Sequence, residues 1–392
     1  MEKTVTTPEK YAARMPMRIG SLFGFQFLAL GIFLPFFPIF LADRGLDDTE
    51  IGFILATPLA IRIAASPLVT AIADRFGRRV LALIVTAGAS AFGFACYAFV
   101  DGFAALFAVA VFTSLFHGAI IPLSDAYAMD AVRSGIGDYG RMRLWGSVAF
   151  VIATLAGGMA LEVWPSSLVP FGLAGSMLAM VVVAATLPEL GHQEGVTPAA
   201  GGPAISLRNP VFLTVLLAVG LIQGSHAVYY GFSSLHWRRA GISETTIGAL
   251  WVVGVIVEIG LFAAATRLRA FVGPMTMVAI GGCAAVVRWL CFPFAESVLA
   301  AFSLQILHGL TFGATHLGMI GFVAVSIPAR RAATAQGLAS TFGGIATALG
   351  TLAAGPLYSA DPVIAFWSMA AGGAIALVLL GAVAVRRLAR QR

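Results

Sequence analysis

The chain has 392 residues, of which 59% are hydrophobic and only 11% are charged, and its formal net charge is +6. A soluble domain carries about 25% charged residues, so this composition excludes an ordinary water-soluble protein. The basic surplus does not indicate a nucleic-acid partner, because no basic patch is interleaved with stacking aromatic residues. We therefore expect the chain to lie in a lipid bilayer.

Apolar runs long enough to cross a bilayer, roughly 20 residues each, recur from one end of the chain to the other. The polar start at 1–18 is too long for an ordinary secretion signal and no small-residue cleavage site follows it, so the first run stays as a span. The sequence predicts an all-α membrane protein with twelve spans at 17–40, 48–72, 79–99, 102–126, 141–163, 167–187, 209–236, 245–267, 272–292, 295–322, 332–356 and 362–386.

A polar stretch rich in Pro and Gly follows the sixth span at 187–210. It divides the chain into an expected N-terminal six-helix bundle (1–187), a cytoplasmic linker (188–208) and a C-terminal six-helix bundle (209–392). Lys and Arg gather on the tails and on alternate loops, and cytoplasmic loops concentrate these residues. We therefore expect both termini in the cytoplasm. The three cysteines lie in apolar segments without metal-ligand spacing, which predicts buried, inert thiols.

The two halves repeat one another. Arg62 and Glu258 are lone charges in apolar stretches, and they are 258 − 62 = 196 positions apart, half the chain. At the same offset a further set recurs: Gly45, Thr49, Ile51 and Gly52 as Gly241, Thr245, Ile247 and Gly248. One residue out of step, a second set recurs: Gly140, Gly146, Thr154, Leu155 and Gly158 as Gly337, Gly343, Thr351, Leu352 and Gly355. Duplicated bundles place solute sites near the bilayer midplane, where the copies meet.

The loop after the second span carries a compact motif, Asp74-Arg75-Phe76-Gly77-Arg78-Arg79. Gly77 permits a tight turn, the arginines suit a headgroup surface, and Asp74 is placed to accept hydrogen bonds from the start of a neighbouring helix. This loop resembles the signature between the second and third helices of the major facilitator superfamily, although Thr70 replaces the usual leading Gly. The resemblance implies the fold of that superfamily, with two pseudo-symmetric six-helix bundles and a conformational gate in this loop. The alternative is an ordinary basic cytoplasmic loop.

Polar residues inside spans are costly and commonly line a solute path. His117 and Asp125 lie in the span at 102–126, and His308 and His316 repeat their eight-residue spacing in the span at 295–322, on one helix face if each helix is regular. The remaining candidates are Arg143 and Trp145 in the fifth span, His226, Tyr229 and Tyr230 in the seventh, Glu258 in the eighth, and Arg288 in the ninth.

Several blocks of the chain resemble the sugar, nucleoside and phenylpropionate proton symporters related to lactose permease, and the phenylpropionate type most of all. They are GIFLPFFPIFL (31–41), PLSDA (122–126), DYGRMRLWGSVAFVI (138–152), QGSHAVYYGF (223–232), GALWVVGVIVE (248–258), VVRW (286–289) and LQILHGLTFG (304–313). The resemblance places the sugar-holding carboxylate and arginine on Asp125 and Arg143. It places the arginine and histidine of proton coupling on Arg288 and His308.

One position departs from that pattern, because the glutamate that carries the coupling proton is Thr311 here. Glu258 is the only carboxylate in the membrane core of the second half, so we expect it to carry the proton, with Arg288 and His308 coupled to it. The membrane core holds three arginines and two carboxylates, which leaves one positive charge for an anionic solute; they are Arg62, Arg143 and Arg288 against Asp125 and Glu258. We expect Arg62 or Arg143 to bind the anionic group of that solute.

The sequence therefore predicts a proton-coupled symporter that imports a small aromatic or aryl-alkyl carboxylate, such as 3-phenylpropionate, by alternating access. The expected substrate-binding residues are Arg62, His117, Asp125, Arg143, Trp145, His226, Tyr229, Tyr230 and His316. A structural Asp125–Arg143 ion pair and histidines that only bond neighbouring helices stay open as alternatives, as do a sugar or nucleoside symporter, an efflux antiporter and a membrane sensor.

No nucleophile–base set, nucleotide loop or metal cluster appears, so we expect neither an enzyme nor a cofactor. Protons, a small-molecule substrate and lipid are the expected partners of a monomer. The resemblance implies the inner membrane of a bacterium as its location.

Overall fold

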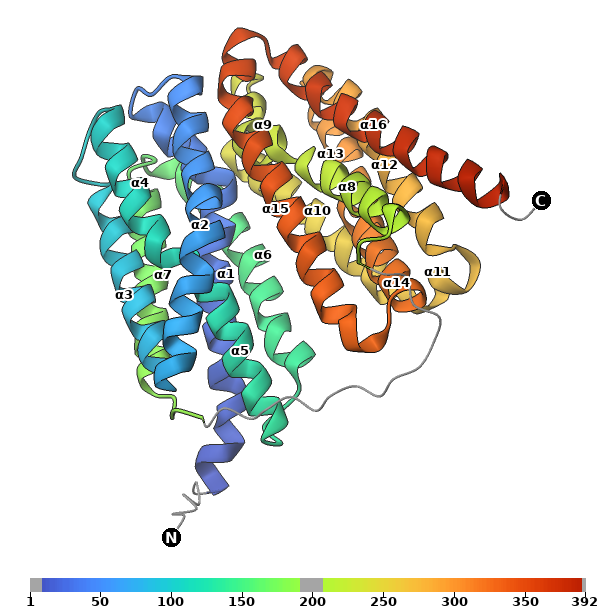
Figure 1. The fold of residues 1–392 in the computed structure, drawn as a ribbon. Coiled ribbons are helices and arrows are strands. Elements are labelled where there is room, and N and C mark those ends of the chain that lie inside the picture. Colours follow the sequence, from blue (N-terminus) through green and yellow to red (C-terminus); the bar gives the residue numbers. More distant parts are fainter. Residues whose placement is uncertain (1–8, 191–206, 390–392) are drawn as a thin grey trace. The chain divides into compact units, whose positions relative to one another are not determined.

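The computed structural model describes residues 9–190 and 207–389. Helices account for almost all of this part of the chain (Figure 1). Their bounds are α1 Glu9–Asp43, α2 Asp48–Phe76, α3 Arg79–Cys96, α4 Phe103–His117, α5 Ile120–Arg133, α6 Tyr139–Val163, α7 Leu168–Ala185, α8 Pro210–Gly224, α9 Ala227–Arg239, α10 Glu244–Ala263, α11 Ala265–Phe271, α12 Pro274–Cys291, the 3₁₀ turn η1 Phe292–Phe294, α13 Val298–His308, the π-helix η2 Gly309–Ala314, α14 Thr315–Ser326, α15 Ala329–Ala360 and α16 Pro362–Ala389.

Twelve helical segments of the described chain are long and apolar enough to cross a membrane, which confirms the predicted spans. Three of them are interrupted. The fourth span divides into α4 and α5, the seventh into α8 and α9, and the tenth into α13, η2 and α14. The predicted linker at 188–208 lies largely outside the described residues. Broken spans are tolerated in a membrane only where the freed backbone groups are buried in protein or line a cavity.

Local sequence explains where several helices begin. Asp138 caps α6 by accepting a hydrogen bond from the backbone N–H of Arg141, and Asn209 caps α8, where Pro210 is pre-set for the first turn. Ser243 and Ser297 cap α10 and α13 in the same way. These polar side chains satisfy backbone donors that have no partner within the helix.

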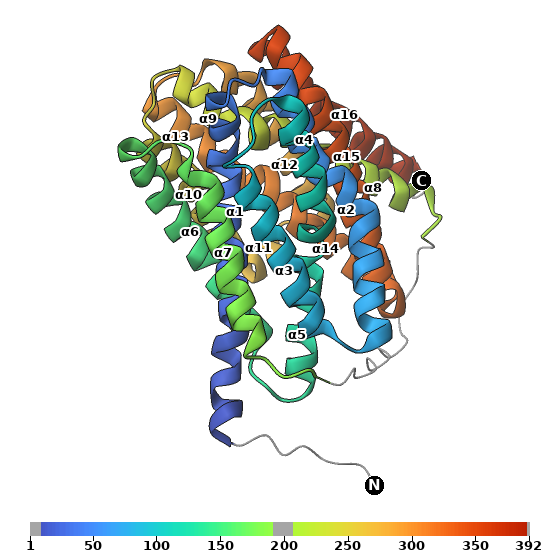
Figure 2. The same cartoon turned by 90° about the vertical axis from the view of Figure 1, so that its left-hand side faces the viewer.

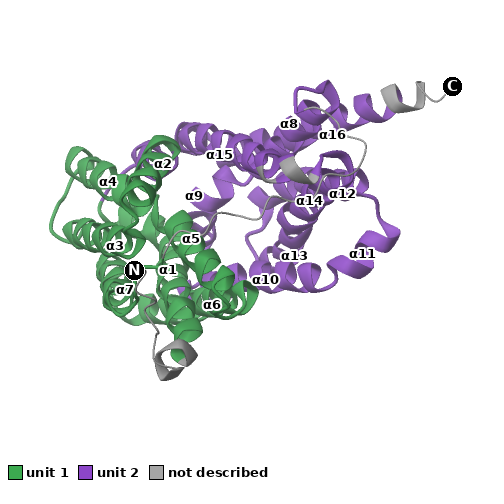
Figure 3. Cartoon of the chain, turned by 60° about the horizontal axis from the view of Figure 1, so that its bottom comes forward, with its two compact units in different colours: residues 1–44, 60–195 green, residues 45–59, 196–392 purple. Residues whose placement is uncertain are grey.

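The helices pack into two compact units, which are coloured separately in Figure 3. Unit 1 contains residues 1–44 and 60–195, and unit 2 contains residues 45–59 and 196–392. The division cuts through α2, because its first turns pack with the helices of unit 2. The boundaries predicted from the sequence, 1–187 and 209–392, stay a prediction.

Each unit has the same packing scheme. In unit 1, α1 packs along α6 and α7, and α3 packs along α7 and α4; Figure 2 shows α3 beside α7. In unit 2, α8 packs along α15 and α16, and α12 packs along α16 and α14. The spans in these pairs are equivalent once the sixth span is aligned with the twelfth, although α4 is the first part of the fourth span and α14 the last part of the tenth. The duplication seen in the sequence is therefore a duplication of how the spans pack.

Two glycines show the repeat in backbone detail. Gly45 and Gly241, which are 196 positions apart, both have φ +80°, a conformation that favours glycine. After Gly45, the start of α2 fits against α15, where a methyl group on Gly52 would lie 2.6 Å from the Cα of Gly355. Beside this contact Arg239 donates two hydrogen bonds to the carboxylate of Asp48, at 2.7 and 3.0 Å. The first turns of α2 are therefore fastened to unit 2 by packing and by charge.

The cysteines differ from the sequence prediction. All three are free thiols, but Cys283 and Cys291 are exposed and Cys96 is half-buried. Hydrocarbon solvates an outward-facing thiol in a membrane helix, so an apolar flanking sequence does not imply burial.

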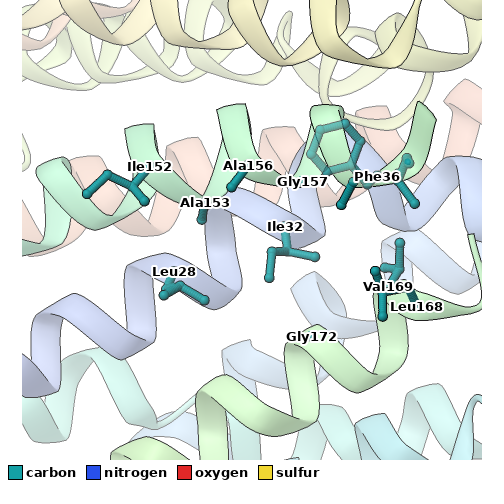
Figure 4. Close-up of a pocket in the computed structure, with 12 residues that line it drawn as sticks. Leu28, Ile32, Phe36, Ile152, Ala153, Ala156, Gly157, Leu168, Val169 and Gly172 are labelled. Atoms are coloured by element: carbon teal, nitrogen blue, oxygen red, sulfur yellow. The ribbon is translucent and has the colours of Figure 1, made fainter. Parts of the chain in front are cut away.

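An apolar cavity of about 260 Å³ lies in unit 1 between α1, α6 and α7 (Figure 4). Leu28, Ile32 and Phe36 of α1 form one side of it. Its lining is almost wholly apolar, so it holds no polar group that could orient a solute.

Candidate functional site

A fully buried guanidinium forms the centre of a polar cluster in unit 2. Nη2 of Arg288 donates to Oε1 of Gln305 at 2.6 Å, and Nη1 donates to Nδ1 of His308 at 3.0 Å and to Oγ1 of Thr311 at 3.3 Å. Nε of Arg288 is buried and has no hydrogen-bond partner among the described residues. Within the described part of the chain, no carboxylate lies within ion-pair distance of Arg288. This charge is therefore held by neutral groups, which is an unusual state for a buried arginine.

Aromatic rings and an amide hold the guanidinium in place. The ring centres of Tyr229 and Trp289 lie 4.5 Å from its central carbon, within cation–π distance. The amide nitrogen of Gln305 donates to the Tyr229 hydroxyl at 2.9 Å and to the carbonyl oxygen of Leu250 at 2.7 Å. These two acceptors fix the amide so that its oxygen faces Arg288.

The interruption of the tenth span places Thr311 in this cluster. Thr311 lies within the π-helix η2, and its hydroxyl oxygen is 2.9 Å from Nε2 of His226. His226 itself occupies the break between α8 and α9, where its Nδ1 lies 3.2 Å from the carbonyl oxygens of Ile222 and Gln223. Two interrupted spans thus meet at one hydrogen bond, and π-helical segments occur frequently at functional sites.

Glu258 lies on the neighbouring helix α10. A methyl group on Gly313 of η2 would be 3.7 Å from Cγ of Glu258, and one on Gly254, a turn earlier along α10, would be 3.3 Å from Cδ2 of His308. The face of α10 that carries Glu258 therefore packs on the interrupted tenth span. The structure brings Glu258, Arg288 and His308, the three residues predicted for proton coupling, into one region of unit 2.

Aromatic residues cover the same cluster. The rings of His308 and Phe312 stack with centres 5.8 Å apart, and those of Phe312 and the exposed His316 stack at 6.2 Å. The ring of Tyr230 stacks on His226 at 5.7 Å. The predicted pairing of His308 and His316 on one face holds, although the intervening helix is a π-helix.

A second cluster occupies unit 1, where the predicted pairing of Asp125 with Arg143 takes another form. Asp125 accepts a hydrogen bond of 2.9 Å from the hydroxyl of Tyr139. Among the described residues, the two charges are not within ion-pair distance, although Arg143 is close enough to interact electrostatically with Asp125 and with the Tyr139 hydroxyl. A structural ion pair between α5 and α6 is therefore wrong, because Tyr139 occupies the place of the partner.

Phenylalanines of α1 flank Arg143. Its central guanidinium carbon lies 3.9 Å from the ring centre of Phe27 and 5.6 Å from that of Phe23. Trp145, also on α6, is 54% exposed, and a methyl group on Gly20 of α1 would lie 2.6 Å from its ring. A half-buried cation between aromatic rings is a suitable receptor for the carboxylate of an aryl compound.

The break in the fourth span lies at His117 and Gly118. His117 is half-buried, its buried Nδ1 has no hydrogen-bond partner among the described residues, and its ring meets that of Phe94 edge-on at 5.2 Å. The exposed Arg62 packs at the break, since a methyl group on Gly118 would lie 2.9 Å from its Cγ. The break places His117 at the end of α4 and Asp125 in α5, so the spacing argument for a regular helix does not apply to this pair and their common face stays a prediction.

The gate loop forms an ion-pair cluster. Gly77 has φ +61°, as its tight turn requires, while Arg75 and Arg78 are exposed. Nε of Arg79 donates to Asp74 at 2.8 Å, and Nη1 donates to Asp130, a carboxylate that is 1% exposed.

The expected capping role of Asp74 is wrong in this structure. Both carboxylate oxygens of Glu189 accept hydrogen bonds from the start of α3, at the backbone N–H groups of Val80 and Leu81. A carboxylate at a helix N-terminus satisfies its free donors and its dipole. Asp74 instead accepts a hydrogen bond from Arg79.

Sequence reasoning missed Gln305 and Tyr139. Gln305 lies in the block LQILHGLTFG and Tyr139 in the block DYGRMRLWGSVAFVI, both of which resemble the proton symporters. A search for buried amides and hydroxyls three residues from His308, or next to the start of the fifth span, would have found both.

Twelve spans, a duplicated packing scheme and clusters of polar residues inside the helices define a membrane transporter. The family model described as "MFS_1 like family" matches residues 17–369. The chain therefore belongs to this family of the major facilitator superfamily.

Known proteins of this kind resemble the chain over most of its length. It is 32% identical over 358 residues to a "Probable 3-phenylpropionic acid transporter" of Escherichia coli (strain K12), covering 88% of this chain and 91% of that protein. It is 25% identical over 346 residues to a "Maltose permease" of Geobacillus stearothermophilus, covering 85% of each. A crystal structure of the nucleoside transporter NupG superimposes with a TM-score of 0.78 at 15% identity, over 94% of this chain and 98% of that one, which shows the fold alone.

Proposed function

We propose that the protein is a proton-coupled symporter that imports a small aryl-alkyl carboxylate, such as 3-phenylpropionate. The observation that carries the proposal is that, among the described residues, neither Arg143 in unit 1 nor the buried Arg288 in unit 2 has a carboxylate within ion-pair distance. A buried charge without a counter-charge costs several kcal/mol. A monovalent organic anion compensates such a surplus when it enters the bundle, whereas a neutral sugar does not.

The residues divide between two tasks in this proposal. In unit 1, Arg143 between Phe23 and Phe27 is the first candidate to clamp the carboxylate, and Arg62 is the second. In unit 2, Glu258 takes up and releases the coupling proton. Arg288 and His308, in the same region, couple this change in the charge of Glu258 to the interrupted tenth span. The relative that is called a probable 3-phenylpropionic acid transporter supports the choice of substrate.

Uptake of labelled 3-phenylpropionate, a nucleoside and a disaccharide by proteoliposomes, with and without an inward proton gradient, tests this function. We expect saturable, gradient-driven uptake of phenylpropionate alone. Protein-free liposomes are the necessary control, because an undissociated weak acid crosses lipid unaided and accumulates on the alkaline side.

Other outcomes assign other functions. Gradient-driven uptake of the disaccharide alone would contradict the carboxylate proposal and would fit the resemblance to a maltose permease. Substrate movement opposite to the proton would indicate an efflux antiporter of the same fold.

A further inference from the structure

The hydrogen bonds around Thr311 fix the protonation of the two buried histidines. Carbonyl oxygens only accept, so Nδ1 of His226, which lies 3.2 Å from two of them, carries a hydrogen. A guanidinium only donates, so Nδ1 of His308, 3.0 Å from Nη1 of Arg288, carries none. One free acceptor nitrogen is left on His226, namely Nε2 facing Thr311.

The Thr311 hydroxyl has one hydrogen and two places to donate it. Its oxygen accepts from Arg288 at 3.3 Å, and it lies 2.9 Å from Nε2 of His226 and 3.2 Å from the carbonyl oxygen of His308. While His226 is neutral, the hydrogen faces Nε2. When Nε2 gains a proton it becomes the donor, and the hydroxyl turns its own hydrogen to the His308 carbonyl.

We propose that His226 is a second proton-binding position of the transport cycle, and that Thr311 is the positioning residue that makes it so. The proton adds to Nε2, one hydroxyl rotates, no hydrogen bond is lost and no heavy atom moves. The same proton on Nδ1 of His308 would displace the bond from Arg288. The inference rests on the proposed function, because it also needs an anionic substrate.

The requirement for an anionic substrate follows from the charged and titratable groups that face His226. Arg288 on α12 and His308 on α13 lie directly against it, Tyr229 and Tyr230 follow on α9, and Glu258 on α10 interacts with Tyr230. Together with Glu258 on α10, a protonated His226 next to Arg288 would leave one uncompensated positive charge in the membrane interior, which is stable only with an added anion. Binding of the carboxylate and of this proton therefore favour one another, and such coupling is reciprocal.

Phenylpropionate binding to the purified protein, measured from about pH 6 to 8 where histidines titrate, tests the inference. We expect the wild-type Kd to fall up to about tenfold for each pH unit of acidification, as uptake of one proton requires. Thr311→Ser keeps the hydroxyl and should keep this slope. Thr311→Val, of nearly the same size, and His226→Gln should remove most of it.

The binding measurements distinguish a wrong substrate from a wrong role for His226. Absence of phenylpropionate binding by the wild-type protein at every pH would overturn the proposed substrate and, with it, this inference. Binding without a pH slope, or an unchanged slope in both Thr311→Val and His226→Gln, would overturn the inference and leave the substrate standing. A slope that only Glu258→Gln removes would likewise overturn it, since the proton would then reside on Glu258 alone.

Discussion

The amide oxygen of Gln305 lies 2.6 Å from Nη2 of Arg288, so a neutral side chain completes the surroundings of a fully buried guanidinium. Replacing Gln305 by Leu should destabilise the protein by roughly 2–4 kcal/mol, because a charged donor and the carbonyl of Leu250 lose their partner. The thermal unfolding midpoint of the purified protein measures this. Ser303→Ala on the exposed side of the same helix should leave the midpoint within error, and an unchanged Gln305→Leu midpoint would contradict the network.

The contact between Phe27 and Arg143 predicts an effect on affinity. Phe27→Leu removes a cation–π contact worth about 1 kcal/mol, so the guanidinium is held less firmly. We expect KM for phenylpropionate uptake to rise about fivefold while kcat changes little, whereas Phe27→Tyr should retain the wild-type KM. A lower kcat with an unchanged KM in Phe27→Leu would show that Arg143 does not hold the substrate.

The close approach of Gly355 to α2 predicts a difference between two glycines of one helix. A methyl group on Gly355 would lie 2.7 Å from the carbonyl oxygen of Asp48 and 2.9 Å from the Cα of Gly52, whereas one on Gly344 meets nothing within 4 Å. Gly355→Ala should cost about 1–3 kcal/mol through overpacking. Gly344→Ala should be neutral or slightly stabilising in the same unfolding assay, and equal midpoints would refute the contact.

Glu258 should be required for accumulation and not for exchange. Its Gln variant cannot release a proton, so gradient-driven accumulation of phenylpropionate should be lost. Exchange of internal unlabelled for external labelled substrate should persist, because exchange needs no net proton movement. Accumulation that survives intact in Glu258→Gln would remove Glu258 from the proton path.

The spans and their duplication could be predicted from the sequence because bilayer thickness sets the length of an apolar run. The 196-residue offset between Gly45 and Gly241 even carries over to their common φ of +80°. The pairing of Arg288 with His308 also follows from the resemblance to lactose permease and its relatives, whereas Glu258 was expected beside them as the only carboxylate in the membrane core of the second half.

The partners of the polar residues could not be predicted, because they depend on how neighbouring helices are rotated and where they break. Asp125 bonds to Tyr139 on the next helix, and Glu189, not Asp74, caps α3. A regular period of 3.6 residues also fails at His117 and at the π-helix after His308, where the helix itself changes.

Substrate-induced proton movement tests whether transport of the carboxylate is coupled to a proton. Phenylpropionate is added outside proteoliposomes without an imposed gradient, and the external pH is followed against protein-free liposomes, which report passive entry of the acid. We expect a protein-dependent alkalinisation of the outer medium that Glu258→Gln abolishes. Acidification, or a pH trace identical to that of protein-free liposomes, would contradict it.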